Sequence, residues 1–169
     1  MSGALASFSA AELGGFAIAA ALQRAGVQPH EVEHVIMGQV LMAGQGQVPS
    51  RQAASKAGIP MSVPSISINK VCLSGLNSIY LADQMIASGE ADIVIAGGME
   101  SMTNAPHLLL KGRSGIRIGH DRIYDHMMLD GLEDAYEPGR AMGTFGEECA
   151  EKYKFSREAQ DKFAIASVE

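Results

Sequence analysis

The sequence contains no tryptophan, and aromatic residues make up only 5% of its 169 positions. Proteins that bind single-stranded nucleic acid stack bases on aromatic side chains set among basic residues, and no such pattern is present. Basic residues are also in the minority, since 13 lysines and arginines stand against 19 aspartates and glutamates. Nucleic-acid-binding domains usually carry a basic excess, so we expect no nucleic-acid partner.

Cysteine is scarce as well. The two cysteines, Cys72 and Cys149, are far apart in the chain and form no Cys-x-x-Cys pair, so zinc sites and thioredoxin-like redox chemistry have no support. Two cysteines are too few for the disulfide scaffold of a small secreted protein. We therefore predict no metal site and a reducing, cytoplasmic location.

Long apolar runs are absent too. No stretch approaches the ~18 consecutive apolar residues of a membrane-spanning helix, and the first residues lack the basic segment and apolar run of a signal peptide. We expect no association with a membrane. Apolar residues nevertheless make up 47% of the chain, which is enough for the core of one compact domain with or without an appendage.

Helix and strand patterns alternate through the first hundred residues. Ser9 and Glu12 match a capping box, and the helix that they begin extends to Gly26. This alternation is typical of α/β domains whose strands are buried on both faces. The pattern predicts strands at 35–41, 65–69 and 92–98, and helices at 50–56 and 74–88.

Beyond Gly98 the periodic pattern is lost. Residues 99–140 show no long apolar period, and a loop of that length in a compact domain is usually functional or contacts a partner. A helical pattern resumes at 143–153, and Ser156 caps a last helix that continues to Glu169 without a stop signal. The long loop carries four basic residues, Lys111, Arg113, Arg117 and Arg122.

Cys72 lies where a cysteine can become reactive. Residues 69–75 join a predicted strand to a predicted helix, so Cys72 is at or just before a helix N-terminus. The free N–H groups and the positive dipole end there favour a thiolate. On position alone, an inert buried cysteine is an equally good interpretation. Cys149 lies among glutamates, which disfavour a thiolate, and we interpret it as structural.

A thiolate at Cys72 would suit one kind of chemistry. When a thiolate attacks a thioester it forms another thioester, so the transfer is nearly thermoneutral and reversible. The acyl group held on the cysteine can then be attacked by a second nucleophile, which divides one difficult reaction into two easier steps. A reactive cysteine at this position could therefore carry an acyl group.

Several segments, in order and in one register, resemble those of one family. Residues 68–75, Ile-Asn-Lys-Val-Cys-Leu-Ser-Gly, resemble the nucleophile segment of the thiolases, the acetyl-CoA acetyltransferases and 3-ketoacyl-CoA thiolases. Residues 94–103 resemble the strand and turn that follow the nucleophile helix. Residues 130–136 and 141–143 resemble the start of the family's loop domain, and 156–161 resemble the helix after it.

The resemblance implies a fold. It is a thiolase-like layered α/β domain with a mostly buried mixed sheet, followed by the start of a loop domain. We place the partial N-terminal domain at residues 1–104, with the family's first strand missing, and the start of the CoA-binding and tetramerisation loop domain at residues 105–169. The chain is then expected to be the truncated N-terminal portion of a thiolase, and its sheet would leave an apolar face exposed.

The resemblance also implies a reaction. Cys72 would accept the acyl group of an acyl-CoA, and the acyl-enzyme would condense with acetyl-CoA; in reverse, CoA would cleave a 3-ketoacyl-CoA. By the same correspondence Leu132 and Met142 contact the pantetheine and acyl region, and the main-chain N–H of Cys72 donates to an oxyanion hole. No cofactor is implied beyond the coenzyme A thioesters, which are substrates.

The family's assembly gives a further expectation. The full-length form should be a homo-oligomer, a dimer or a tetramer. The stretch from Lys111 to Arg122 corresponds to the region that many members use for tetramer contacts or for the nucleotide end of CoA, and a solvated charged loop is an equally good interpretation.

Some family motifs have no counterpart here: Asn-Glu-x-Phe-Ala, Gly-His-Pro and Cys-Gly-Gly-Gly, which carry the catalytic histidine and the general acid/base cysteine. The alternatives are therefore a catalytically inactive product that acts as an assembly partner, and a ketoacyl-synthase-like condensing enzyme, which shares the cysteine before a helix. None of the five histidines stands in a matching motif, and each is interpreted as a surface or loop residue: His30, His34, His107, His120 and His126.

Overall fold

The computed structural model describes all 169 residues, which form two compact units, Met1–Gly131 and Leu132–Glu169. The first unit contains the predicted α/β architecture, and the second is helical. The domain boundary expected at residues 104 and 105 refers to a longer protein and stays a prediction. No helix in the structure has both the length and the apolar character needed to cross a membrane.

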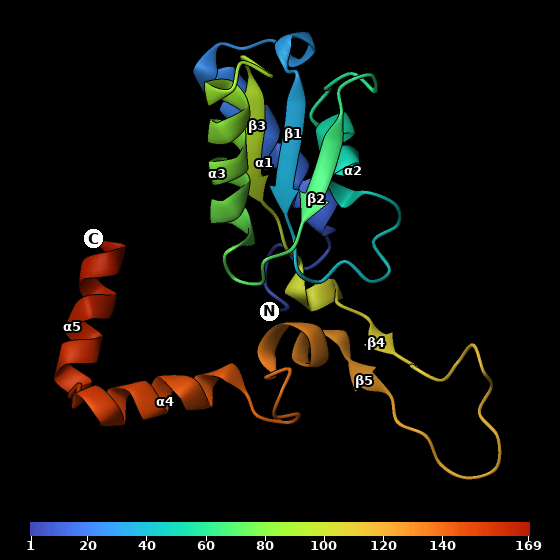
Figure 1. Ribbon diagram of the computed structural model, residues 1–169, viewed down its shortest axis with the longest axis vertical. Coiled ribbons are helices and arrows are strands. Elements are labelled where there is room, and N and C mark those ends of the chain that lie inside the picture. Colours follow the sequence, from blue (N-terminus) through green and yellow to red (C-terminus); the bar gives the residue numbers. More distant parts are fainter. The chain divides into compact units, whose positions relative to one another are not determined.

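A parallel three-stranded sheet forms the centre of the first unit, in the order β2-β1-β3 (Figure 1). Its strands are β1 (His34–Gly38), β2 (Ser65–Ile68) and β3 (Val94–Gly98). Gly38 at the end of β1 pairs with Ile68 and with Gly98, so the carboxyl ends of all three strands meet at one edge. This edge is where ligands bind in open parallel sheets.

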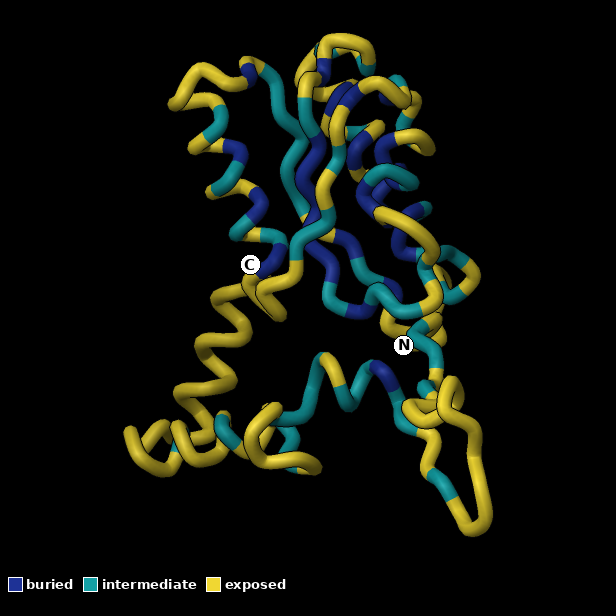
Figure 2. Tube along the Cα trace, turned by 45° about the vertical axis from the view of Figure 1, so that its right-hand side comes forward, coloured by how far each residue is buried: buried dark blue, intermediate teal, exposed yellow.

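Burial is greatest in the middle strand. Val35, Ile36 and Met37 are at most 2% exposed, whereas the flanking strands are only partly buried (Figure 2). The middle strand therefore contributes the most deeply buried residues of the sheet to the core. The apolar core cluster consists of Ala10, Ile18, Leu22, Val32, Val35, Met37, Ala53, Ala54, Ile59, Val63 and Met99.

Two helices, α1 (Ala10–Ala25) and α2 (Pro49–Lys56), pack against each other on one face of this sheet (Figure 1). The predicted capping box is present at Ser9. The sequence places Gly14 and Gly15 inside α1, and the packing explains them. A Cβ on Gly14 would lie 3.1 Å from Cβ of Ala53, and one on Gly15 would lie 2.8 Å from Cβ of Lys56.

Helix α3 (Ser74–Ala87) covers the other face with its small residues. Ser74, Ser78 and Ala82 are buried, and the Ser78 hydroxyl donates to the carbonyl of Gly97 in β3 at 2.8 Å. The large apolar residues of α3 are exposed on the side of the helix away from the sheet, whereas the exposed face expected from the sequence was one of the sheet itself. They are Leu76, Ile79, Tyr80 and Ile86, each between 48% and 63% exposed.

Only short elements interrupt the long irregular segment after β3. They are η2 (Met102–Asn104), β4 (His107–Leu108), β5 (Tyr124–Asp125) and the π-helical turn η3 (Met128–Leu132). Strands β4 and β5 pair antiparallel. The four basic residues of the loop lie between these two strands and are exposed.

The second unit contains α4 (Met142–Tyr153) and α5 (Arg157–Val168), and neither helix has a buried residue. The predicted cap of the last helix is present, because the Ser156 hydroxyl accepts the main-chain N–H of Ala159 at 3.1 Å.

Candidate active site

The loop that carries Cys72 runs from Asn69 to Leu73, between the end of β2 and the beginning of α3, and is called the Cys72 loop below. Its own side chains hold its backbone. The Asn69 side chain accepts the N–H of Val71 at 2.9 Å. The Ser74 hydroxyl accepts the N–H of Lys70 at 2.8 Å and donates to the carbonyl of Val71 at 2.6 Å. The loop is therefore a tight, internally bonded turn.

The residue before the cysteine has a strained backbone. Val71 has φ of 49°, a left-handed conformation that is a genuine outlier for a β-branched residue. Such strain costs of order 1–3 kcal/mol and persists only where the surroundings enforce it, which is often at functional sites. Here two hydrogen bonds enforce it: the N–H of Val71 donates to the Asn69 side chain, and the Ser74 hydroxyl donates to the carbonyl of Val71.

Cys72 is a free, exposed cysteine two residues before the first residue of α3. The predicted position at a helix N-terminus is confirmed, and the alternative of a buried cysteine is wrong, while the reactivity of Cys72 stays a prediction. The Lys70 ammonium is directed along α3 and not towards Cys72, because it donates to the side chain of Asn77 at 3.1 Å. Cys149 is also exposed, but it lies in the interior of α4, away from the start of that helix.

Close backbone contacts position the beginning of α3 on the sheet. A Cβ on Gly38 would lie 2.5 Å from the carbonyl carbon of Ser74 and 2.6 Å from the nitrogen of Gly75, and one on Gly98 would lie 3.3 Å from Cα of Gly75. Only glycines permit this approach. The ends of β1 and β3 thus place the Cys72 loop directly beside the carboxyl edge of the sheet.

Polar residues just after β3 bind neighbouring loops, a role for which the sequence carries no local signal. The carboxylate of Glu100 accepts the N–H groups of Val40 and Leu41 at 2.8 and 3.1 Å. The amide of Asn104 donates to the carbonyls of Ala6 and Phe8, at 3.0 Å in each case. The segment that resembles a family motif therefore fastens the loop after β1 and the N-terminal segment to the sheet edge.

His126 differs from the surface or loop residue that we expected. Its side chain is buried, because the residue is only 5% exposed, and it contacts Asp130 and the backbone of Ala43. The sequence contained one signal for this pair, a histidine and an aspartate at i and i+4. The part-buried contact with Ala43, 83 residues earlier, had no local signal.

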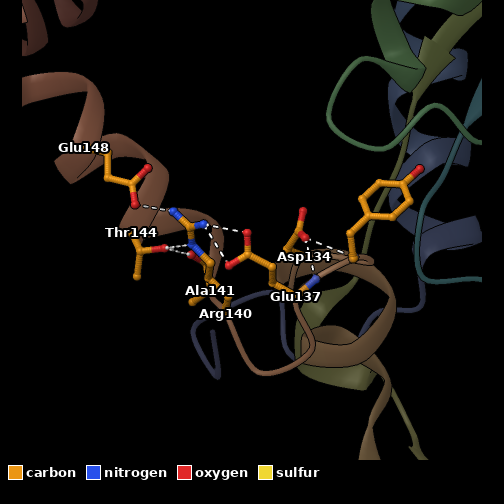
Figure 3. A network of polar contacts seen from close by, with 7 residues as sticks. Asp134, Glu137, Arg140, Ala141, Thr144 and Glu148 are labelled. Carbon is orange, nitrogen blue, oxygen red and sulfur yellow. Dashed lines mark hydrogen bonds and ion pairs between the residues drawn. The ribbon is translucent and has the colours of Figure 1, made fainter. Parts of the chain in front are cut away.

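The second unit has its own polar network around Arg140 (Figure 3). The guanidinium donates to both carboxylate oxygens of Glu137 at 2.9 Å, to Thr144 at 3.2 Å and also to Glu148. Its carbon lies 3.8 Å from the ring centre of Phe145. Hydrogen bonding and charge from Glu137, followed by the charge of Glu148, raise the pKa of Arg140. This network orders the turn that leads into α4.

The two proposed substrate contacts also belong to the second unit. Leu132 is the last residue of η3 and is half-buried, and Met142 is the first residue of α4 and is 41% exposed. Their contact with an acyl-CoA stays a prediction. No group of three or more histidine, cysteine, aspartate or glutamate side chains has the arrangement of a metal site.

Comparison with known proteins identifies the family. The model of the thiolase N-terminal domain matches residues 1–169. A probable acetyl-CoA acetyltransferase of Mycobacterium leprae and the acetyl-CoA acetyltransferase of Cupriavidus necator are each 53% identical over 165 residues, which is 98% of this chain and 42% of the relative. Acetyl-CoA acetyltransferase 1 of Arabidopsis thaliana is 53% identical over 167 residues, 99% of this chain and 40% of the relative. The chain thus spans about two fifths of the length of these relatives. Because the family model matches the chain along its whole length, the chain belongs to the thiolase family.

Proposed function

We propose that the protein is an acyl-CoA C-acyltransferase that forms or cleaves 3-ketoacyl-CoA through an acyl group carried on Cys72. The observation that carries this proposal is the exposed residue Cys72 in a strained turn just before the beginning of α3. A helix N-terminus stabilises a thiolate. The relatives named acetyl-CoA acetyltransferases indicate acetyl-CoA as a substrate.

In the first step, the Cys72 thiolate attacks the thioester carbon of acyl-CoA. The C–S bond to coenzyme A breaks, CoA leaves as a thiolate that takes up a proton, and a new thioester joins the acyl group to Cys72. The negative oxygen of the tetrahedral intermediate needs hydrogen-bond donors, and the main-chain N–H of Cys72 is the donor that we propose. The new thioester keeps the acyl group reactive.

In the second step, a general base takes a proton from the methyl carbon of acetyl-CoA, and the resulting carbanion attacks the acyl carbon. A carbon–carbon bond forms, the bond to Cys72 breaks, and the thiolate is regenerated with release of a 3-ketoacyl-CoA. Cleavage is the same sequence in reverse. We propose that Leu132 and Met142 contact the pantetheine and acyl region during both steps, and that the active form is a cytoplasmic homo-oligomer.

Mass spectrometry after incubation with acetyl-CoA tests the first step. We expect one acetyl group on the peptide that contains Cys72 and its release by neutral hydroxylamine, which cleaves thioesters. Cys72→Ser should abolish this adduct, and Cys149→Ser should leave it unchanged. Acetylation confined to Cys149, or equal labelling of Cys72→Ser and the parent chain, would contradict the proposal.

A turnover assay addresses the second step. The residues from Met1 to Glu169 supply the nucleophile, but the motifs that carry the family's histidine and acid/base cysteine have no counterpart among them. We expect this chain by itself to become acylated without cleaving acetoacetyl-CoA, because no general base is in place. Rapid thiolysis of acetoacetyl-CoA by the isolated chain would refute that expectation.

A further inference from the structure

His126 is a buried titratable residue that the proposed mechanism does not use. Both of its ring nitrogens have partners: Nε2 lies 3.3 Å from the main-chain nitrogen of Ala43, and Nδ1 lies 2.6 Å from a carboxylate oxygen of Asp130. A main-chain N–H can only donate, so Nε2 is the acceptor. The hydrogen is then on Nδ1, and the neutral imidazole donates it to Asp130.

The Nε2 atom of His126 accepts an N–H group from the irregular loop after β1. After β1 the chain leaves the sheet, and the N–H groups of Val40, Leu41 and Ala43 find no carbonyl partner. Side chains from much later in the sequence accept them instead: Glu100 accepts the first two and His126 accepts the third. A part-buried N–H without a partner is costly, so these contacts decide where the loop lies.

The same contact positions the segment from His126 to Gly131. The N–H of His126 donates to the carbonyl of Pro106 at 3.1 Å. At the other end of the segment, a Cβ on Gly131 would lie 3.3 Å from Cδ2 of Leu41. The segment is therefore held against the loop after β1 at both ends, and Leu132 is the next residue in the chain.

We propose that His126 is a positioning residue that, as the neutral Nδ1–H tautomer, joins the loop after β1 to the 126–131 segment and thereby sets the position from which Leu132 contacts the pantetheine arm of an acyl-CoA. This inference rests on the proposed acyl transfer to Cys72 and extends it to the recognition of the substrate arm. The imidazole suits the task because it accepts on one side and donates on the other. Asparagine and glutamine can each replace only one of these two bonds.

The kinetic test compares two acetyl donors on the rate of Cys72 acetylation. Acetyl-CoA has the full pantetheine arm, and acetyl-N-acetylcysteamine has only its last part. With His126→Ala we expect the acetyl-CoA concentration for half-maximal rate to rise about five- to tenfold, the size of one lost hydrogen bond, while the maximal rate changes less than about twofold. The rate with acetyl-N-acetylcysteamine should stay unchanged.

Conservative variants separate positioning from general packing. His126→Asn keeps a donor for Asp130, and His126→Gln keeps an acceptor for Ala43, so each should shift the half-maximal concentration less than His126→Ala. His120→Ala, at an exposed histidine, should have no effect. An equal fall in rate with both donors, or equal effects of all three His126 variants, would overturn the proposal.

A second measurement does not depend on acyl transfer. Nitrogen chemical shifts of the imidazole should show a protonated Nδ1 and an unprotonated Nε2 at neutral pH. Amide hydrogen exchange at Ala43 and across residues 126–131 should accelerate at least tenfold in His126→Ala and stay unchanged in His120→Ala. The opposite tautomer, or unaltered exchange, would overturn the positioning role. If the parent chain accepts no acetyl group, the proposed function fails, while these two readouts still decide whether His126 joins the two segments.

Discussion

Gly38 and Ser74 are in direct backbone contact, because a Cβ on Gly38 would lie 2.5 Å from the carbonyl carbon of Ser74. One residue ends the central strand and the other begins the helix that follows Cys72. The position of the candidate nucleophile is therefore determined by the central strand of the sheet. Substitutions at this contact should change the rate of Cys72 acetylation.

Gly38→Ala should separate α3 from the end of β1. The added methyl group meets backbone atoms that cannot turn aside, and overpacking of this kind costs about 1–3 kcal/mol. We expect the midpoint of urea unfolding to fall accordingly, and the rate of Cys72 acetylation to fall with it. Gly75→Ala is the matched control, because its Cβ would meet Gly98 at 3.8 Å, an ordinary contact. Equal stability of the two variants would show that the close contact is not enforced.

Val71→Gly should relieve the strained turn. The Val71 side chain is 48% exposed, so little packing is lost, and glycine adopts positive φ without the penalty of about 1–2 kcal/mol that other residues incur. Part of this gain is offset by the greater freedom of glycine in the unfolded chain. We expect stability to stay level or to rise by up to about 1 kcal/mol, while a looser turn slows acetylation of Cys72.

Val48→Gly provides a matched comparison for the variant at Val71. Val48 also has a positive φ, 41°, and is 46% exposed, but it caps α2 and lies outside the Cys72 loop. Its effect on urea unfolding should resemble that of Val71→Gly, and its acetylation rate should equal that of the parent chain. A similar loss of rate in both variants would remove the link between the strained turn and the reactivity of Cys72.

A fall in pH should lower the stability of the first unit, because it protonates the carboxylate of Glu33. The N–H groups of Asp92 and Ile93 donate to its carboxylate at 2.5 and 3.2 Å, and these bonds lower the pKa of Glu33 below its usual value of 4.5. A carboxyl whose pKa is lower in the folded state stabilises that state fully above the unfolded pKa. The stabilisation is lost as the pH falls through the lowered pKa.

Glu33→Gln tests this contribution. The parent chain should be more stable than the variant at pH 7, and the difference should shrink steadily below about pH 4.5, as measured by urea unfolding at a series of pH values. Glu90→Gln, at an exposed glutamate with no side-chain hydrogen bond, should show no such trend. A difference that grows towards low pH would have the wrong sign for the proposed cause.

Arg140→Lys should loosen the turn before α4. A lysine keeps the positive charge but cannot reproduce the planar, forked set of donors that contacts Glu137, Thr144 and Glu148. We expect faster amide hydrogen exchange from Asp134 to Thr144 in Arg140→Lys. The exchange in Arg140→Ala should be faster still. Arg157→Ala, which removes an exposed ion pair with Asp161, should leave exchange in this turn unaltered. Equal exchange in the three variants would show that the network does not order the turn.

Local patterns predicted the elements well because their signals lie within a few residues. The predicted helix at 74–88 corresponds to Ser74–Ala87, and the capping box at Ser9 is present with both of its hydrogen bonds. Cys72 is found at the beginning of its helix, as predicted. Caps and apolar periods act over one or two helical turns, so an isolated sequence carries this information.

The candidate site was only partly predictable. The motif indicated Cys72 as a candidate nucleophile, which stays a prediction, but nothing local to Glu100 indicates that it accepts the N–H groups of Val40 and Leu41, 60 and 59 residues earlier. The strain at Val71 was not predicted either, since valine gives no signal for a positive φ. These features depend on which loops meet at the carboxyl edge of the sheet.

The sequence by itself determined the order of the main helices and strands of the first unit, and the place of one cysteine between a strand and a helix. The tertiary structure decided which face of α3 packs on the sheet, why Gly38 must lack a side chain, and how His126 comes to accept the N–H of Ala43. The reason is the range of the forces involved. Capping and periodicity act between neighbours in the chain, whereas burial and the pairing of N–H groups outside the sheet depend on segments that only the complete fold brings together.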